Sequence, residues 1–238
     1  DADGINLSWG TSLKRSPADA MQYMTSKGQL TDDAPTSLTR TGLPEFIDVA
    51  QQALDNDVLL VIAVGNDGNY STQVNSWKQV NNLDQSFHLE TFVSSFFDNS
   101  ITVSSTDAMR NLSPYTNTGF TTDISAPGGN NSGNDAFGIL STLPSGITSE
   151  AYTSKLVDKN NGTYGYAQGT SMATPVVSGS AALIKAANPS LSASDIRQVI
   201  MDSALPNTKF KGQVGEHGLQ LNLERALNYA KSWQGSLF

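Results

Sequence analysis

The sequence VLLVIAV at residues 58–64 decides how the rest of this chain is interpreted. Seven consecutive apolar residues without alternation are typical of a strand buried on both faces, as the inner strands of a parallel sheet are. Residues 43–56 come just before this run. Their apolar side chains recur at steps of three and four residues, with Pro44 near the start, which predicts a helix. Residues 5–9 predict a short strand before that helix, so the order strand, helix, strand indicates a βαβ unit.

Similar patterns continue toward the end of the chain. Four further segments have the composition of strands: residues 101–105, 122–125, 137–142 and 163–167. The last two could pair as a long hairpin. Three helices are predicted to close the chain, at residues 171–187, 192–203 and 222–233. The second of them begins with the capping-box pattern of Ser192 and Asp195. These elements predict an α/β protein with a mostly parallel sheet and helices on both faces.

A serine stands at the beginning of the first of these helices. Residues 171–187 carry apolar or small side chains almost all round, so we expect this helix to be buried in a core. Ser171 lies in its first turn, where free backbone N–H groups and the positive end of the helix dipole favour negative charge. A nucleophile of acyl transfer needs such surroundings because its tetrahedral intermediate carries an oxyanion. The alternative is that the hydroxyl only caps the helix.

A polar turn, GNDG at residues 65–68, follows the buried strand directly. The carboxyl end of a parallel strand is where α/β sheets place their binding sites. Asn66 is suited to donate an amide hydrogen bond to a developing oxyanion, together with the backbone N–H of Ser171. The alternative is that Asn and Gly are present only because they suit a turn.

The run GTSMATPVVSG at residues 169–179 resembles the nucleophile motif of the subtilisin-like serine peptidases, the subtilases. The turn at residues 65–68 resembles the Gly-Asn-x-Gly turn of the same family. This resemblance implies a subtilisin-like fold and a serine endopeptidase that cleaves peptide bonds through an acyl-enzyme, with Ser171 as the nucleophile and Asn66 as the oxyanion donor. The acid-acting sedolisins use an aspartate as the oxyanion residue, so Asn66 favours the neutral-to-alkaline branch.

The beginning of the chain resembles the strand that lines the substrate cleft in this family. Such a strand offers its backbone N–H and C=O groups to an extended polypeptide, which is the implied partner. The resemblance implies six substrate-lining residues: Ser8, Trp9, Gly10, Ala63, Val64 and Gly65. Trp9 is bulkier than the usual leucine, and it either narrows a pocket or packs in the core.

The catalytic residues of subtilisin-type enzymes run in the order Asp, His, Ser. Residues 5–10 already resemble the strand that follows the catalytic histidine. We therefore expect residues 1–238 to be the C-terminal part of a single catalytic domain, incomplete at its N-terminal side. The Asp and His would come from the N-terminal part of the same domain, a necessary partner. The two histidines of this chain, His88 and His217, are not expected to act as the base, and the isolated chain is expected to be inactive.

A different class of function stays open, namely a non-catalytic relative that binds peptides or serves as a scaffold. The presence of both Ser171 and Asn66 argues against it, because a chain without catalysis has no physical need for the pair. An esterase of the α/β-hydrolase type is excluded because it would carry Gly-x-Ser-x-Gly around the nucleophile.

Composition narrows the remaining classes. A chain of 238 residues with 38% hydrophobic content suits a single globular domain. A net charge of −8 argues against nucleic acid or an anionic membrane as partner. The absence of cysteine excludes disulfides and a cysteine nucleophile. The longest apolar run is too short to span a bilayer.

No cofactor is expected for the chemistry, and no residue pattern predicts a metal site. The resemblance leaves a structural calcium ion open. It also implies that the protein is secreted or attached to the cell envelope.

Overall fold

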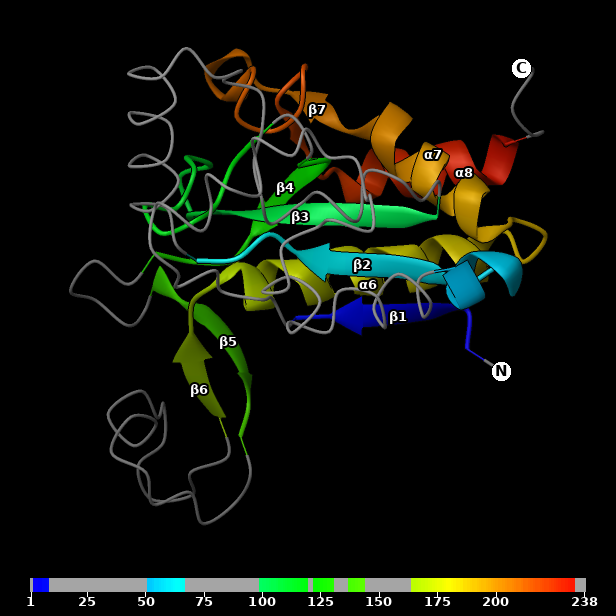
Figure 1. Cartoon of the computed structure of the whole chain (residues 1–238), viewed down its shortest axis with the longest axis horizontal. Helices are drawn as coiled ribbons and strands as arrows, with labels where there is room; N and C mark the ends of the chain where they lie inside the picture. Colours follow the sequence, from blue (N-terminus) through cyan, green and yellow to red (C-terminus); the bar gives the residue numbers. More distant parts are fainter. Residues whose placement is uncertain are drawn as a thin grey trace, which may run out of the picture.

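A six-stranded sheet forms the centre of the molecule (Figure 1). The structure is a computed structural model, and it describes residues 2–8, 51–66, 99–119, 122–130, 137–143 and 164–233. The strand order within the sheet is β1-β2-β3-β4-β8-β7. The strands are β1 (Gly4–Leu7), β2 (Leu59–Ala63), β3 (Ser100–Thr106), β4 (Ile124–Pro127), β7 (Leu205–Pro206) and β8 (Leu219–Gln220). The first four are neighbours in chain order.

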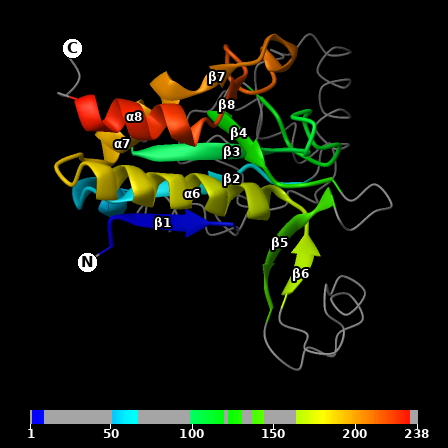
Figure 2. The ribbon, with the colours of Figure 1, turned by 180° about the vertical axis from the view of Figure 1, so that it is seen from behind.

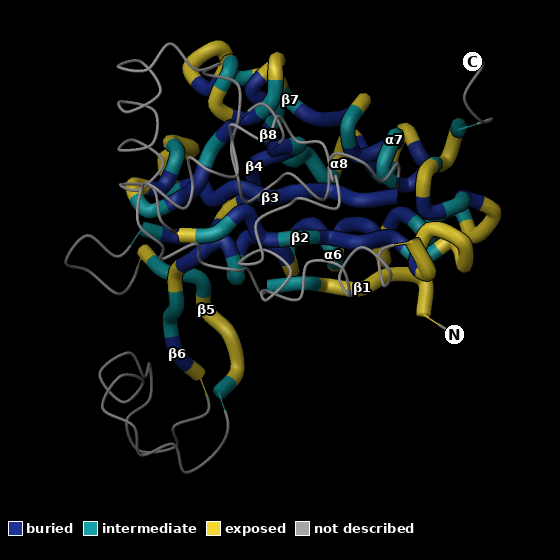
Figure 3. The backbone as a smooth tube through the Cα atoms, in the orientation of Figure 1, coloured by how far each residue is buried: buried dark blue, intermediate teal, exposed yellow. Residues whose placement is uncertain are grey.

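The sheet is parallel except at β7, which pairs antiparallel with β8. The register places Ile5 beside Leu60, and Leu60 beside Ser100. Leu59, Leu60 and Val61 are each 1% exposed, which confirms the prediction of an inner strand buried on both faces. Figure 3 shows this buried band, with β1 exposed at its side. Since parallel strands end at the same edge, the residues after β1, β2 and β4 come together there.

Three long helices accompany the sheet: α6 (Thr170–Ala187), α7 (Ala193–Ser203) and α8 (Leu223–Ser232), together with the short 3₁₀ helix η4 (Thr208–Phe210). Seen from behind, α6 runs along the sheet, where it contacts β1, β2, β3 and β4 (Figure 2). Helices α7 and α8 pack on each other and on α6. Residues 51–55 are helical and lie in front of the sheet in Figure 1, on the other side from α6. The predicted α/β fold with a mostly parallel sheet is confirmed.

The expectation that α6 is buried almost all round is wrong. Ala173, Val177 and Ile184 are fully buried against the sheet, but Leu183 is 51% exposed and Gly179 is exposed on the other side. Small residues fit a core and a surface equally well, so the composition of this helix did not reveal which side faces the sheet.

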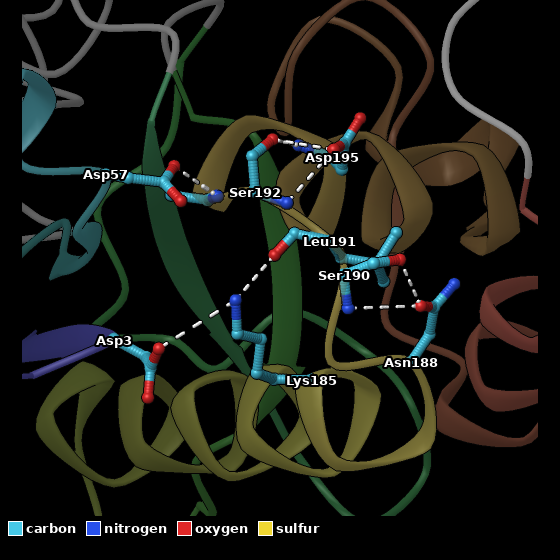
Figure 4. Close-up of polar contacts among 9 residues, drawn as sticks. Asp3, Asp57, Lys185, Asn188, Ser190, Leu191, Ser192 and Asp195 are labelled. Carbon is cyan, nitrogen blue, oxygen red and sulfur yellow. Dashed lines mark hydrogen bonds and ion pairs between the residues drawn. The ribbon is translucent and has the colours of Figure 1, made fainter.

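Figure 4 shows the connection from α6 to α7, where the predicted capping box is present. The Ser192 hydroxyl accepts a hydrogen bond from the Asp195 N–H (3.1 Å), and the Asp195 carboxylate accepts one from the Ser192 N–H (3.0 Å). Asp57, just before β2, accepts a hydrogen bond from the Ala193 N–H (2.7 Å). Lys185 donates to the Leu191 carbonyl (2.7 Å). These contacts fix the start of α7 against the end of α6.

A separate hairpin leads into α6. Its strands are β5 (Ile139–Thr142) and β6 (Tyr164–Ala167), which pair antiparallel with Ile139 beside Ala167. The hairpin projects away from the central sheet in Figures 1 and 2. This confirms the predicted pairing, and it brings the chain to Gly169 at the edge where the parallel strands end.

Candidate active site

The turn at Gly169 places the first turn of α6 at the edge of the sheet where the parallel strands end. Gly169 is the N-cap residue of α6, with φ 145° and ψ 163°, a backbone conformation that side-chain-bearing residues rarely adopt. Its N–H donates to the Gly128 carbonyl just after β4 (3.0 Å). Gly169 has no side chain that could cap the helix. The first turn of α6, which contains Ser171, is therefore positioned by this backbone contact and by side chains from other segments.

Asn66 contacts this turn from the end of β2. Its Oδ1 accepts hydrogen bonds from the Thr170 N–H (2.8 Å) and the Thr170 hydroxyl (3.1 Å). A backbone N–H can only donate, so the amide oxygen must face Thr170 and the amide nitrogen must face away. Within the described part of the chain, neither Asn66 Nδ2 nor the Ser171 N–H has an acceptor. The site thus offers two donors without an acceptor among the described residues, Asn66 Nδ2 and the Ser171 N–H.

Ser171 is held by a reciprocal pair of hydrogen bonds with Ser8. The Ser171 hydroxyl donates to the Ser8 carbonyl (3.0 Å), and the Ser8 hydroxyl donates to the Ser171 carbonyl (3.0 Å). The second bond has a clear reason. Pro175 lies four residues after Ser171 inside α6 and has no N–H, so the helix cannot satisfy that carbonyl. Ser8, at the end of β1, supplies the missing donor.

No imidazole contacts Ser171 in the part of the chain that the structure describes. His217 is exposed in the turn between η4 and β8. His88 lies outside the described residues. The arrangement presents a partly exposed hydroxyl and two donors suited to an oxyanion, while the described residues supply no base beside them.

The other residues predicted to line the substrate are placed as follows. Ala63 ends β2 and is buried, and Gly65 begins the following turn with φ 98°. Val64 is buried; its N–H donates to Val103 O (3.2 Å) and its carbonyl accepts from Asn117 Nδ2 (2.9 Å). Trp9 and Gly10 lie outside the described residues. Substrate contact by all of these residues stays a prediction.

Sequence reasoning missed two residues that shape this site, Thr170 and Asn117. Thr170 directs the Asn66 amide, and Asn117 holds the turn before it, with its N–H donating to the Gly65 carbonyl (3.1 Å). Their partners are 104 and 53 residues away in sequence, so no local pattern joins them. The only signal was that Thr170 stands directly before the serine.

The described residues contain no group of three or more His, Asp or Glu side chains that could hold a metal ion. None of their helices combines the length and the apolar character of a membrane span.

Comparison with known proteins gives a family match over nearly the whole chain. The model of the peptidase S8 or subtilase family matches residues 1–223. Among curated proteins, the minor extracellular protease Vpr of Bacillus subtilis is 37% identical over 98 residues, which are 41% of this chain and 10% of that protein. The major intracellular serine protease of Bacillus subtilis is 32% identical over 143 residues, which are 60% of this chain and 33% of that protein.

Solved structures share the fold. A protease from Pseudoalteromonas arctica superimposes with a TM-score of 0.59 at 24% identity, over 96% of this chain and 51% of that one. A lanthipeptide protease superimposes with a TM-score of 0.63 at 22% identity, over 95% of this chain and 61% of that one. The chain therefore spans a third or less of the curated relatives and somewhat more than half of these structures.

Proposed function

Because the chain belongs to the subtilase family, we propose that it carries the nucleophile and the oxyanion donors of a serine endopeptidase. The observation that carries this proposal is the contact between Asn66 and Thr170. It turns the Asn66 amide nitrogen away from Thr170, and the next residue is a serine whose N–H has no acceptor among the described residues. Two preorganised donors next to a partly exposed hydroxyl form the arrangement that acyl transfer requires.

In the proposed reaction, Ser171 Oγ attacks the carbonyl carbon of the scissile peptide bond and loses its proton to a base. The carbonyl oxygen becomes an oxyanion that accepts hydrogen bonds from the Ser171 N–H and Asn66 Nδ2. The intermediate collapses to an acyl-enzyme and releases the amine, which takes a proton from the base. Water then repeats the sequence and releases the acid. We propose no cofactor for these steps.

The base is proposed to be a histidine oriented by an aspartate, both from the N-terminal part of the same catalytic domain. Two facts support this: the family order of Asp, His and Ser, and the share of the solved relatives, 51% and 61%, that the chain covers. The Ser171 hydroxyl, which donates to Ser8 O in this structure, must rotate toward that base.

The proposed substrate is an extended polypeptide that pairs with the backbone at residues 8–10. We also propose that the protein is secreted or attached to the cell envelope. The names of the two curated relatives do not decide this location, because one is called extracellular and the other intracellular. Fractionation of the producing cells, with immunodetection of the protein in each fraction, tests the location.

Hydrolysis of a peptide amide by the full-length protein tests the function. We expect turnover by the wild type and none above background with Ser171→Ala, which lacks the acyl acceptor but keeps the cleft. Peptide binding without turnover by the wild type would contradict the proposal and favour a peptide-binding module instead.

A further inference from the structure

Three hydroxyl groups form a cluster behind the nucleophile turn, and the proposed reaction does not use them directly. Ser105, at the end of β3, has its Oγ 2.9 Å from the Ser113 Oγ and 2.8 Å from the Tyr115 hydroxyl. The Tyr115 hydroxyl donates toward the carbonyls of Gly128 (2.9 Å) and Gly129 (2.6 Å). The Ser113 hydroxyl donates to the Gly129 carbonyl (2.9 Å). Three of these five contacts end on the turn that follows β4, and the other two join Ser105 to the hydroxyls that make them.

Counting protons fixes the direction of these hydrogen bonds. Each hydroxyl has one proton, and a carbonyl can only accept. Ser113 therefore donates its proton to the Gly129 carbonyl, and Tyr115 shares its single proton between the carbonyls of Gly128 (2.9 Å) and Gly129 (2.6 Å). Ser105 donates to one of those two hydroxyls. The Gly128 carbonyl also accepts the N–H of Gly169 (3.0 Å). The Gly128 carbonyl thus contacts both the Tyr115 hydroxyl and the N–H of Gly169, the N-cap residue of α6.

Close packing around Gly128 restricts the movement of its backbone between the hydroxyl cluster and Gly169. A Cβ on Gly128 would lie 2.2 Å from Ser105 Oγ and 2.6 Å from the Gly169 carbonyl oxygen. The backbone at Gly128 is therefore confined between the hydroxyl cluster and the N-cap of α6. A shift of Gly128 would be transmitted to Gly169 and from there to the Ser171 N–H, two residues later.

The same loop contacts the other side of the site. Asn117 donates through its side chain to the Val64 carbonyl (2.9 Å) and through its backbone to the Gly65 carbonyl (3.1 Å), directly before Asn66. Thr116 Oγ1 accepts the Ser105 N–H (2.9 Å), which ties the middle of the loop to β3. Residues 113–117 thus bind both the turn that carries Asn66 and the turn that leads to Ser171.

We propose that the loop at residues 113–117 is a brace that sets the two oxyanion donors relative to each other, with the Tyr115 hydroxyl as a positioning group acting through the Gly128 carbonyl. Tyr115 does not take part in the chemistry itself. This inference rests on the proposed function, because it assigns Tyr115 to the oxyanion site of the same reaction. An oxyanion site loses rate when a donor is displaced by a fraction of an ångström, even where substrate binding is intact.

The test is the Tyr115→Phe variant of the full-length protein, which removes one oxygen and keeps the ring. We expect kcat on a peptide amide to fall roughly 3- to 10-fold with KM nearly unchanged, the size of one neutral hydrogen bond. The affinity for a peptide boronic acid, which places a tetrahedral centre on Ser171, should fall by the same factor. The control is Ser203→Ala, which removes a buried hydroxyl bonded only inside α7 and should leave kcat unchanged.

Three other results would overturn the inference about Tyr115. A Tyr115→Phe variant with wild-type kcat and boronate affinity would overturn the inference. A loss confined to KM would overturn it too, because it would show that Tyr115 contacts the substrate. A matching loss of kcat in Ser203→Ala would assign the effect to general destabilisation and would also contradict it. If Ser171→Ala retained full activity, the proposed function itself would fail, whatever Tyr115→Phe showed.

Discussion

The proposed roles of Asn66 and Ser171 are separable, because the first would act mainly in the transition state and the second would form the covalent bond. In Asn66→Leu the nucleophile stays, but the amide donor and the contact with Thr170 are lost. We expect kcat to fall roughly 10²- to 10³-fold with KM nearly unchanged, as the loss of this kind of donor does in subtilisin. Steady-state kinetics on a peptide amide measure both constants. A large rise in KM with kcat preserved would show that Asn66 binds the ground state, and the oxyanion assignment would be withdrawn.

The bond from the Ser8 hydroxyl to the Ser171 carbonyl replaces a helix bond that Pro175 cannot make. Ser8→Ala should therefore cost about 1 kcal/mol of unfolding free energy, because the carbonyl loses its donor. In a Pro175→Ala background the new N–H of residue 175 can donate to that carbonyl, so the same Ser8→Ala change should cost less.

Denaturant unfolding of the four proteins in this double-mutant cycle measures the coupling between the two positions. Equal costs of Ser8→Ala in both backgrounds would contradict the explanation, since the two residues would then act independently.

At the residue scale, the sequence alone was enough to select Ser171 and Asn66 as candidates, because each stands in a short motif with its own chemistry. It could not show how the pair is oriented. The orientation depends on Thr170, on the Ser8 hydroxyl and on Asn117, whose partners are 104, 163 and 53 residues away. Contacts at such separations follow from the sheet topology, which brings strand ends together.

At the start of α7, the stabilising effect of the Asp195 carboxylate depends on pH. Burial raises the pKa of Asp195, but hydrogen bonds from the Ser192 hydroxyl, the Ser192 N–H and the Trp233 indole N–H outweigh it, so the pKa is lowered from 3.8. A lowered folded-state pKa means that the ionised carboxylate stabilises the fold above the unfolded value. This stabilisation is lost as the pH falls through the folded value.

Asp195→Asn should therefore lower the melting temperature at pH 7, and its difference from wild type should shrink as the pH drops below about 4. Melting temperatures across pH 3 to 7 measure this. The control is Asp202→Asn, which removes an exposed carboxylate from the same helix. A difference between Asp195→Asn and wild type that is constant over this range would refute the assignment.

At the element scale, long periodic or apolar segments were predicted correctly from the sequence. The strands β2 and β3, the β5–β6 hairpin and the helices α6, α7 and α8 are where their patterns predicted them. Strands β7 and β8 were missed because each has two residues and is defined by its pairing: β7 pairs with β8, and β8 also pairs with β4. The exposed side of α6 was missed because Gly179 and Ala182 carry no directional signal.

At the scale of the whole molecule, β1 and α6 leave a groove open beside the sheet. It has a volume of about 250 Å³, and Ile5, Leu59 and Ala182 are among its lining residues. Among the described residues β1 pairs only with β2. Ser171, the proposed nucleophile, lies in the first turn of α6, whose outer side is exposed in the described structure. The described residues around Ser171 include no base.

This leads to a prediction for the isolated 238-residue chain, which should not react with a fluorophosphonate probe. The proposed base lies outside this chain, and a serine without a base is a weak nucleophile; loss of the base costs about 10⁶ in kcat in subtilisin. Burst labelling of this chain alone would contradict the prediction, and it would direct attention to His88 or His217 as the base.

The position of a covalent label in the full-length protein directly tests whether Ser171 is the nucleophile. Treatment with a fluorophosphonate, followed by peptide mass spectrometry, identifies the residue that acts as nucleophile. We expect one adduct per molecule, on Ser171, that disappears in Ser171→Ala. Peptide hydrolysis that persists while Ser171 stays unlabelled, or an adduct on another residue, would contradict it.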